Sequence, residues 1–334
     1  MTNCYFSCII LDKNTRRIHI KIVFLDAATI GDDLTYENFE EVGDVGVYPT
    51  TSDAEFEDHV SGADVVVINK LKLNATNLPK ATRLKLICLA ATGFDNVDLE
   101  YCRKAGIGVC NVVGYSTQSV AQLTISMALS LYTNLGQFTD FVRSGEYTKC
   151  GLANRLTPVY HEISGKTWGI VGYGNIGKQV ARVAEAMGCH ILVYKRTPVE
   201  GVECVDFDTI CQKSDVLSLH VPLNEQTRNL LDKEHIEMLK KDAVVINVAR
   251  GAVTNEMALA NAILDGKIAG LGVDVYSKEP FDLNHPFNKI KHLPNVLLTP
   301  HMAWGGYETR VRLLGEIKEN IKSFFAGKNR CRVD

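Results

Sequence analysis

Short apolar runs recur along the chain with helical patterns between them, and each run is continuously apolar instead of alternating with polar residues. The runs lie at residues 20–26, 63–69, 84–91, 167–174, 190–195, 215–221, 243–249, 270–276 and 295–301. Continuous apolarity is typical of strands that are covered on both faces, as in a parallel sheet with helices on either side. The sequence therefore predicts an α/β fold built on doubly wound parallel sheets.

The size and charge of the chain narrow the class of partner. Its 334 residues indicate about two domains. The 36 Lys and Arg side chains nearly balance the 39 Asp and Glu side chains, and the formal net charge is -3. Such a balance argues against nucleic acid or an anionic membrane as a partner. We therefore expect a small-molecule ligand.

Cysteine usage and the N-terminus indicate the compartment. The ten cysteines are scattered without a CxxC pair, which is typical of reduced thiols in a cytosol and predicts neither disulfides nor a metal site. No apolar run approaches the roughly 18 residues of a membrane span, and the N-terminus lacks the pattern of a secretion signal. We expect a soluble, cytoplasmic protein. Residues 1–19 carry no recognisable motif and are interpreted as an N-terminal extension.

A glycine-rich turn follows the apolar run "TWGIV". The turn is "GYGNIG", residues 172–177, and the pattern after it predicts a helix. Glycines at such a turn let the backbone approach a pyrophosphate, and the N–H groups at the helix start hold its negative charge. The motif predicts a dinucleotide site, with a simple packing turn between strand and helix as the alternative. The predicted contacts are Gly172, Gly174, Asn175, Ile176 and Gly177.

The end of the next predicted strand bears on the choice of dinucleotide. An acidic residue at this position binds the adenosine ribose of NAD, whereas Arg or Lys accommodates the 2′-phosphate of NADP. This chain has Lys195, Arg196 and Thr197 there and no carboxylate. We predict a preference for NADP through Arg196. NAD stays possible, with Lys195 and Arg196 as solvated strand-end residues.

Three chemically capable residues each follow a predicted strand. They are Arg250 in "NVARGAV", Glu279 in "DVYSKEP" and His301 in "LTPHMAW". The carboxyl ends of parallel strands face the ligand crevice, so these distant residues are expected to converge. A 2-keto acid needs a guanidinium for its carboxylate, an acid for its carbonyl oxygen, and a carboxylate that keeps this acid charged. Together they predict reduction of such an acid.

These motifs resemble the D-isomer-specific 2-hydroxyacid dehydrogenase family. The resemblance runs over about residues 20–326 and is carried by "ATGFDNVD", "GYSTQSVAQ", "GKTWGIVGYGNIG", "DVLSLHVPLNEQTRNLL", "INVARGAV", "GVDVYSKEP" and "LTPHMAW". It implies two Rossmann-like doubly wound domains with the active site in the cleft between them, and a homodimer. The implied substrate domain is 20–115 plus 302–330, and the implied NAD(P)-binding domain is 116–301.

The resemblance also implies roles for single residues. His301 would be the proton donor in reduction, Glu279 its partner, and Arg250 the anchor of the carboxylate and carbonyl. Asp274 matches the acidic residue that the family places near the nicotinamide and the histidine. The ending "HMAW", in which Trp304 lies three residues beyond His301, is most similar to the same segment of hydroxypyruvate and glyoxylate reductases, and implies that Trp304 contacts substrate.

The outer domain would supply the remaining substrate contacts. By position in the family pattern, the backbone N–H groups of Thr92 and Gly93 would hold the substrate carboxylate. Lys70 and Leu71 would form another wall of the site. Leu123 departs from the pattern, because many relatives carry a polar or His residue there.

Two functions from different classes follow from this fold. The favoured one is an enzyme that reduces a small 2-keto acid, with hydroxypyruvate or glyoxylate preferred. The alternative is a nucleotide-regulated binding protein that resembles the corepressors of the same fold. The nearly neutral charge and the lack of long disordered tails favour the enzyme.

Overall fold

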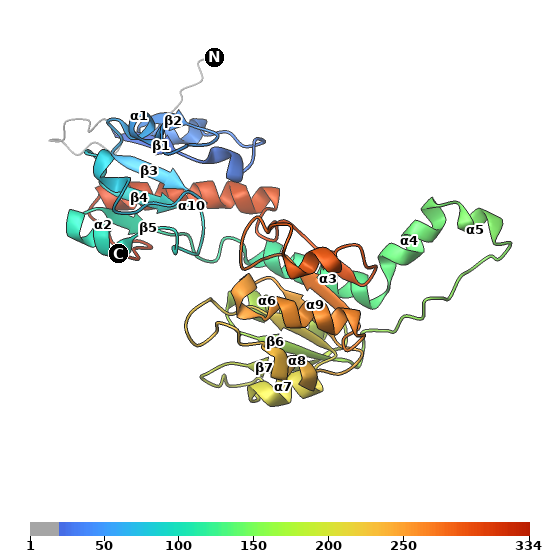
Figure 1. Cartoon of the computed structure of the whole chain (residues 1–334). Coiled ribbons are helices and arrows are strands. Elements are labelled where there is room, and N and C mark those ends of the chain that lie inside the picture. The colour runs from blue at the N-terminus through green and yellow to red at the C-terminus, as the bar shows by residue number, and fades with distance from the viewer. Residues whose placement is uncertain (1–19) are drawn as a thin grey trace, which may run out of the picture. The chain divides into compact units, whose positions relative to one another are not determined.

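The computed structural model describes residues 20–334, and they divide into two compact units (Figure 1). Unit 1 contains the described residues up to Val113 together with Val311–Asp334, and unit 2 is Gly114–Arg310. The predicted extension, residues 1–19, lies outside the described residues. Each unit is an α/β domain with a parallel sheet, so the predicted fold class is confirmed.

Unit 1 is built on a five-stranded parallel sheet of order β2-β1-β3-β4-β5. Helices α1 and α2 and the short helix η3 pack on one face. Helix α10 buries Leu313, Leu314, Ile317 and Ile321 in this unit. The strands are β1 (Lys21–Phe24), β2 (Asp44–Val47), β3 (Val65–Ile68), β4 (Leu86–Leu89) and β5 (Gly108–Cys110), and the helices are η1 (Ala27–Thr29), η2 (Glu37–Phe39), α1 (Phe56–Val60), η3 (Leu78–Lys80), α2 (Leu99–Ala105) and α10 (Tyr307–Phe325).

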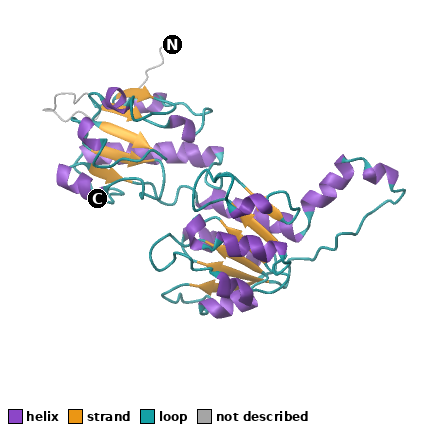
Figure 2. Cartoon of the chain, in the orientation of Figure 1, coloured by secondary structure: helices purple, strands orange, loops and turns teal. Residues whose placement is uncertain are grey.

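Unit 2 is built on a six-stranded parallel sheet of order β11-β10-β9-β8-β6-β7. Helices α3 and α6 cover one face, and α7, α8 and α9 cover the other. Figure 2 shows the strands of this unit with helices packed around them. The strands are β6 (Thr167–Val171), β7 (His190–Tyr194), β8 (Val216–Leu219), β9 (Val244–Asn247), β10 (Gly270–Val273) and β11 (Val296–Leu298). The covering helices are α3 (Thr117–Tyr132), α6 (Asn175–Ala186), α7 (Phe207–Lys213), α8 (Lys233–Met238) and α9 (Glu256–Leu264), with η4 (Gly251–Val253) and η5 (Pro286–Lys289) in the connections.

The continuous apolar runs form strands because both faces of each sheet are covered. Every residue of β3, β4, β8, β9 and β10 is buried. Strands β2 and β5 were not predicted. In β2 no residue is buried, since it lies at the sheet edge, and β5 has only three residues. Neither can show the long apolar run that marks a central strand.

The segment after His301 groups with unit 2 in the structure. Ala303 donates its N–H to Asp274 Oδ2 over 2.9 Å, and its carbonyl accepts a hydrogen bond of 2.6 Å from Ser119 Oγ. These bonds hold residues 302–310 on unit 2, so the chain changes units after Arg310. The predicted change of domain is at 301/302.

A projecting segment of unit 2, residues 135–160, was not predicted. It contains α4 (Leu135–Arg143) and α5 (Glu146–Lys149), and neither helix has a buried residue. Figure 1 shows both helices reaching away from the sheet of their own unit. The segment exposes Leu152 by 66%, Leu156 by 73% and Val159 by 68%. We call residues 135–160 the arm.

Among residues 20–334, no helix reaches the combination of length and hydropathy that would let it cross a membrane.

Candidate functional site

The carboxyl-terminal edge of the unit 2 sheet gathers the residues that the sequence singled out in this unit. Gly172 follows β6, Arg196 follows β7, and Arg250 follows β9. Glu279 and His301 follow β10 and β11. All these strands run parallel, so their carboxyl ends share one edge. Strand order also reverses at β6, which pairs with both β7 and β8, and such a switch point is where open α/β sheets bind ligands.

The glycine turn combines two packing glycines with one that faces open space. Gly172 has a φ of +98°, and a Cβ there would lie 2.9 Å from the His220 carbonyl carbon. A Cβ at Gly177 would lie 2.1 Å from Gly172 O. At Gly174 no heavy atom lies within 4 Å of the Cβ position. Packing explains Gly172 and Gly177. It does not explain Gly174, so a bound ligand is favoured over a simple packing turn.

The start of α6 is accessible to that ligand. Gly174 is the N-cap, and both Gly174 and Asn175 are exposed, while Ile176 is half-buried. A helix start of this kind presents free backbone N–H groups and the positive end of the helix dipole. The site therefore suits the pyrophosphate of a dinucleotide.

The basic residues after β7 are all exposed. Lys195, Arg196 and Thr197 follow the last residue of the strand, Tyr194. Arg196 Nη1 donates a hydrogen bond to Gln226 Oε1, which is a neutral acceptor. Among the described residues no carboxylate forms an ion pair with this guanidinium, so it can attract an anion at this end of the sheet.

His301 and Glu279 form a close pair. His301 Nδ1 lies 2.6 Å from Glu279 Oε2, and Glu279 Oε1 accepts a 2.9 Å hydrogen bond from the N–H of Tyr276. The two side chains are 22% and 30% exposed, so solutes can reach them. A carboxylate beside Nδ1 stabilises a proton on that nitrogen and orients the ring.

Asp274 holds the loop that carries His301. Its Oδ1 accepts hydrogen bonds from Thr299 Oγ1 over 2.6 Å and from Met302 N over 2.8 Å, and its Oδ2 accepts from Ala303 N. The backbone of His301 is in the left-handed region, with a φ of 53°. A residue other than glycine keeps this conformation only when the surrounding structure holds it. Burial raises the pKa of Asp274. The predicted cofactor contact of Asp274 stays a prediction.

Arg250 is fixed beside the segment that bears Glu279. Its carbonyl accepts a 3.0 Å hydrogen bond from Asn247 Nδ2, and its Nη1 donates to Ala249 O over 2.8 Å. A Cβ at Gly251 would lie 2.0 Å from the carbonyl carbon of Tyr276, so the two backbones are in direct contact. Arg250 therefore follows the same sheet end as the His301–Glu279 pair, and a guanidinium is a group that can bind a carboxylate.

Trp304 lies close to the same loop. It is half-buried, and its ring centroid is 6.5 Å from that of Tyr115. Its predicted contact with substrate stays a prediction.

The predicted substrate residues of unit 1 gather at the carboxyl edge of that sheet. Lys70 and Leu71 come after β3, and Thr92 and Gly93 come after β4. Thr92 Oγ1 donates to Val112 O over 2.8 Å, and Thr92 O accepts from Asn111 Nδ2 over 2.7 Å. These bonds hold the Thr92–Gly93 turn in place.

The sequence interpretation missed Asp26. This buried carboxylate binds the backbone of residues 69–71. The signal was present, because Asp26 is the last residue of the first apolar run and thus stands at the end of a predicted parallel strand.

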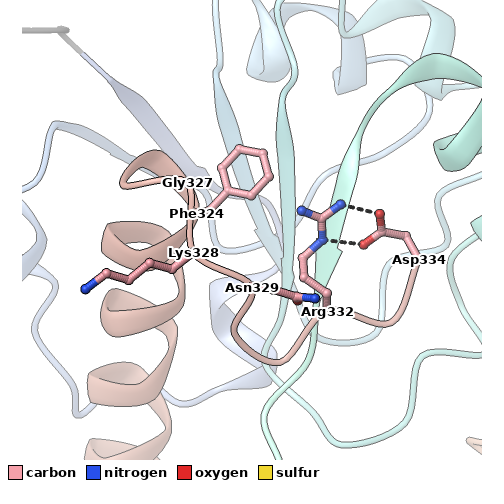
Figure 3. A pocket seen from close by; sticks show the side chains of 6 residues that line it. All are labelled: Phe324, Gly327, Lys328, Asn329, Arg332 and Asp334. Carbon is pink, nitrogen blue, oxygen red and sulfur yellow. Dashed lines mark hydrogen bonds and ion pairs between the residues drawn. The ribbon is translucent and has the colours of Figure 1, made fainter.

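A hollow of about 430 Å³ lies elsewhere on unit 1, at the C-terminal tail (Figure 3). Its lining residues are Phe324, Gly327, Lys328, Asn329, Arg332 and Asp334. Arg332 Nε donates to Asp334 Oδ1 over 2.6 Å, and the same oxygen accepts from Val109 N over 2.8 Å. The guanidinium is thus already paired, and the carboxylate docks the tail on β5. We do not assign the hollow to the candidate site.

Comparisons with known proteins agree with this geometry. A family model described as D-isomer specific 2-hydroxyacid dehydrogenase, NAD binding domain, matches residues 125–303. The chain is 35% identical over 309 residues to glycerate dehydrogenase from Methylorubrum extorquens, covering 92% of this chain and 97% of that protein. It is 32% identical over 321 residues to hydroxypyruvate reductase from Blautia hydrogenotrophica, with coverage of 92% and 98%. Its structure is similar to an acyclic imino acid reductase in complex with NADPH and D-Arg, with a TM-score of 0.83, 29% identity, and coverage of 94% and 100%.

Proposed function

Because the chain belongs to the D-isomer-specific 2-hydroxyacid dehydrogenase family and is therefore an oxidoreductase, we propose that it reduces hydroxypyruvate or glyoxylate to the corresponding 2-hydroxy acid. The single observation that supports this chemistry most directly is the 2.6 Å contact between His301 and Glu279. An acid paired with a carboxylate is the group that a carbonyl reduction requires. The names of the glycerate dehydrogenase and the hydroxypyruvate reductase support the choice of substrate.

Three residues of unit 2 have different roles in the proposed reduction. The glycine turn at Gly172–Gly177 would hold a reduced dinucleotide, whose nicotinamide would supply the hydride for the carbonyl carbon. His301 donates a proton to the keto oxygen, which becomes the hydroxyl of the product. Glu279 stabilises the charged imidazole before this transfer, and Arg250 binds the substrate carboxylate and polarises the carbonyl.

The predicted substrate residues in unit 1 complete this proposal. The backbone N–H groups of Thr92 and Gly93 would bind the substrate carboxylate, and Lys70 and Leu71 would form a wall. Both pairs follow central strands of their sheet, where the ligand-binding loops of α/β domains lie.

NADP is the proposed dinucleotide. The open position at Gly174 and the exposed start of α6 would receive the pyrophosphate, and Asn175 and Ile176 belong to the same turn. Arg196, assisted by Lys195 and Thr197, would bind the 2′-phosphate. Two observations support this choice: the positions after β7 carry cations and a hydroxyl instead of a carboxylate, and Arg196 has a neutral partner.

A homodimer is the proposed assembly, formed through the arm. The arm exposes large apolar side chains, and its helices α4 and α5 bury no residue. Several large exposed apolar side chains on one segment favour a protein interface there. A second copy of the chain would cover Leu152, Leu156 and Val159.

The cytoplasm is the proposed compartment, because the scattered cysteines of the chain would stay reduced there.

Spectrophotometric turnover tests the proposed function. The purified chain is assayed with a panel of 2-keto acids, with NADH and NADPH in parallel, at 340 nm. We expect turnover of hydroxypyruvate or glyoxylate, and more efficient turnover with NADPH. Tight nucleotide binding without turnover of any 2-keto acid would favour the alternative, a nucleotide-regulated binding protein.

A further inference from the structure

Asp26 is a buried carboxylate that binds one loop through its backbone. The residue follows β1 and is only 5% exposed. Its Oδ1 accepts a 2.9 Å hydrogen bond from Asn69 N, while Oδ2 accepts from Lys70 N over 2.6 Å and from Leu71 N over 2.8 Å. Three successive N–H groups therefore converge on one side chain that lies more than forty positions earlier in the sequence.

The same loop is held from its other side. Asn96 Nδ2 donates to Leu71 O over 2.8 Å and to Asn69 O over 3.3 Å. Asn69 Nδ2 donates in turn to Thr29 Oγ1 over 3.0 Å. The N–H groups of residues 69–71 and the carbonyls of Asn69 and Leu71 are thus bound by side chains, which fixes the backbone conformation of the loop.

The neighbouring turn has the opposite pattern. In residues 20–334, the N–H groups of Thr92 and Gly93 donate no hydrogen bond to the protein. Both turns follow central strands of the sheet and bear residues of the proposed substrate site. One turn thus keeps its N–H groups available for an anion, while the other has its N–H groups occupied by Asp26.

We propose that Asp26 is the positioning residue of the substrate wall, which consists of Lys70 and Leu71. By binding their N–H groups it fixes the backbone from which the exposed Lys70 and the half-buried Leu71 project, and it prevents this loop from competing for the substrate carboxylate. The substrate then binds in one orientation, with its carboxylate at Thr92 and Gly93 and its remaining carbon atoms against Leu71. This inference rests on the proposed function, because the wall is defined by the substrate.

Asp26→Asn tests the proposal. The amide keeps the size of the side chain but replaces one acceptor oxygen with an NH₂ group that faces the N–H donors of the loop. We expect the KM for the keto acid to rise about ten-fold or more with kcat nearly unchanged, since the variant loses substrate binding and keeps the reacting groups. The dissociation constant for NADPH, measured by fluorescence titration, should stay the same.

Asp64→Asn is the matched control in the same sheet. Asp64 is 1% exposed and also accepts hydrogen bonds, from Lys21 N and Arg83 Nη2. It precedes β3, however, and so lies at the amino-terminal end of the strands, opposite the proposed substrate site. Its replacement should lower the unfolding midpoint and leave KM unchanged. Asp26→Asn could likewise lower the unfolding midpoint and the fraction of active protein while KM stays unchanged. In that case Asp26 has only a structural role and the proposal is wrong.

Residue-resolved hydrogen exchange on the wild-type chain gives a test that needs neither folding of a variant nor turnover. The amides of Lys70 and Leu71 should exchange slowly, and those of Thr92 and Gly93 should exchange fast. Fast exchange at Lys70 and Leu71 would overturn the role of Asp26 even in an active enzyme. Slow exchange at Lys70 and Leu71 together with no turnover of any 2-keto acid would instead contradict the proposed function. The hydrogen bonds between Asp26 and the loop would then still be supported.

Discussion

Glu279 links His301 to the end of β10: one carboxylate oxygen lies 2.6 Å from His301 Nδ1, and the other accepts the N–H of Tyr276. The carboxylate is thus fixed by the backbone of its own segment before it contacts the imidazole. This arrangement lets Glu279 set the orientation of the His301 imidazole.

Glu279→Gln should lower kcat for keto-acid reduction, because the neutral amide no longer fixes the imidazole of His301 through a charged contact. We expect a smaller loss than the removal of the imidazole causes, since the proton donor itself is kept. The dissociation constant for NADPH should stay the same. Equal kcat values in the variant and the wild type would contradict the pairing.

His301→Ala should lower kcat for keto-acid reduction by about 10² or more, because a positioned acid contributes about 10² to 10⁴ to the rate. NADPH binding, followed by fluorescence titration, should change little. His292→Ala is the control, since His292 is exposed and precedes β11 instead of following it. Equal rates in the two variants would remove His301 from the mechanism.

Arg196→Ala should raise the KM for NADPH ten-fold or more and leave the KM for NADH nearly unchanged. Charge-assisted hydrogen bonds to a phosphate are each worth about 1.5 to 3 kcal/mol, and NADH has no such phosphate. Arg182→Ala removes another exposed cation, in the second half of α6, and should affect neither constant. A wild-type enzyme that uses NADH more efficiently than NADPH would refute the proposed preference.

His220 should make the wild-type chain lose stability in acid. Its Nε2 lies 3.0 Å from Ser218 Oγ, its Nδ1 is buried with no hydrogen-bond partner among the described residues, and burial lowers its pKa from 6.5 to about 3. Between these values the unfolded chain binds a proton that the folded chain does not bind. The free energy of unfolding should therefore fall by about 1.4 kcal/mol per pH unit as the pH drops below the unfolded pKa.

Urea unfolding of His220→Gln measures this effect. Trp168 reports on the region, because its Nε1 donates to the same Ser218 Oγ over 2.9 Å, and Trp304→Phe removes the second tryptophan. The loss of stability between about pH 6.5 and pH 4.5 should be smaller in the variant than in the wild type. Equal slopes would show that His220 is protonated in the folded chain.

Leu156→Glu should shift the protein from dimer to monomer, because Leu156 is 73% exposed on the arm and a carboxylate there opposes burial against a second copy. Light scattering coupled to size exclusion measures the molar mass. Leu283→Glu, at a position that is 91% exposed outside the arm, should leave the mass unchanged. A monomeric wild type would contradict the proposed assembly.

The sequence predicted the sheet class and the family from local patterns. Strand periodicity and turn glycines are visible in a few consecutive residues, and both are confirmed in the structure and by the family comparison. Edge strand β2 and the arm were missed for the same reason. None of their residues is buried in the single chain, so nothing in the local pattern of burial distinguishes them from loops.

By itself the sequence determined which residues stand at strand ends: Arg250, Glu279 and His301 are placed there by the apolar runs that precede them. Only the tertiary structure decided what these ends contact. Asp274 binds Met302 and Ala303, and Asp26 binds the loop at Lys70, because the order of strands in each sheet brings together segments that are far apart in the chain. A hydrogen bond across such a separation depends on strand order, and no local pattern of polar and apolar residues contains that order.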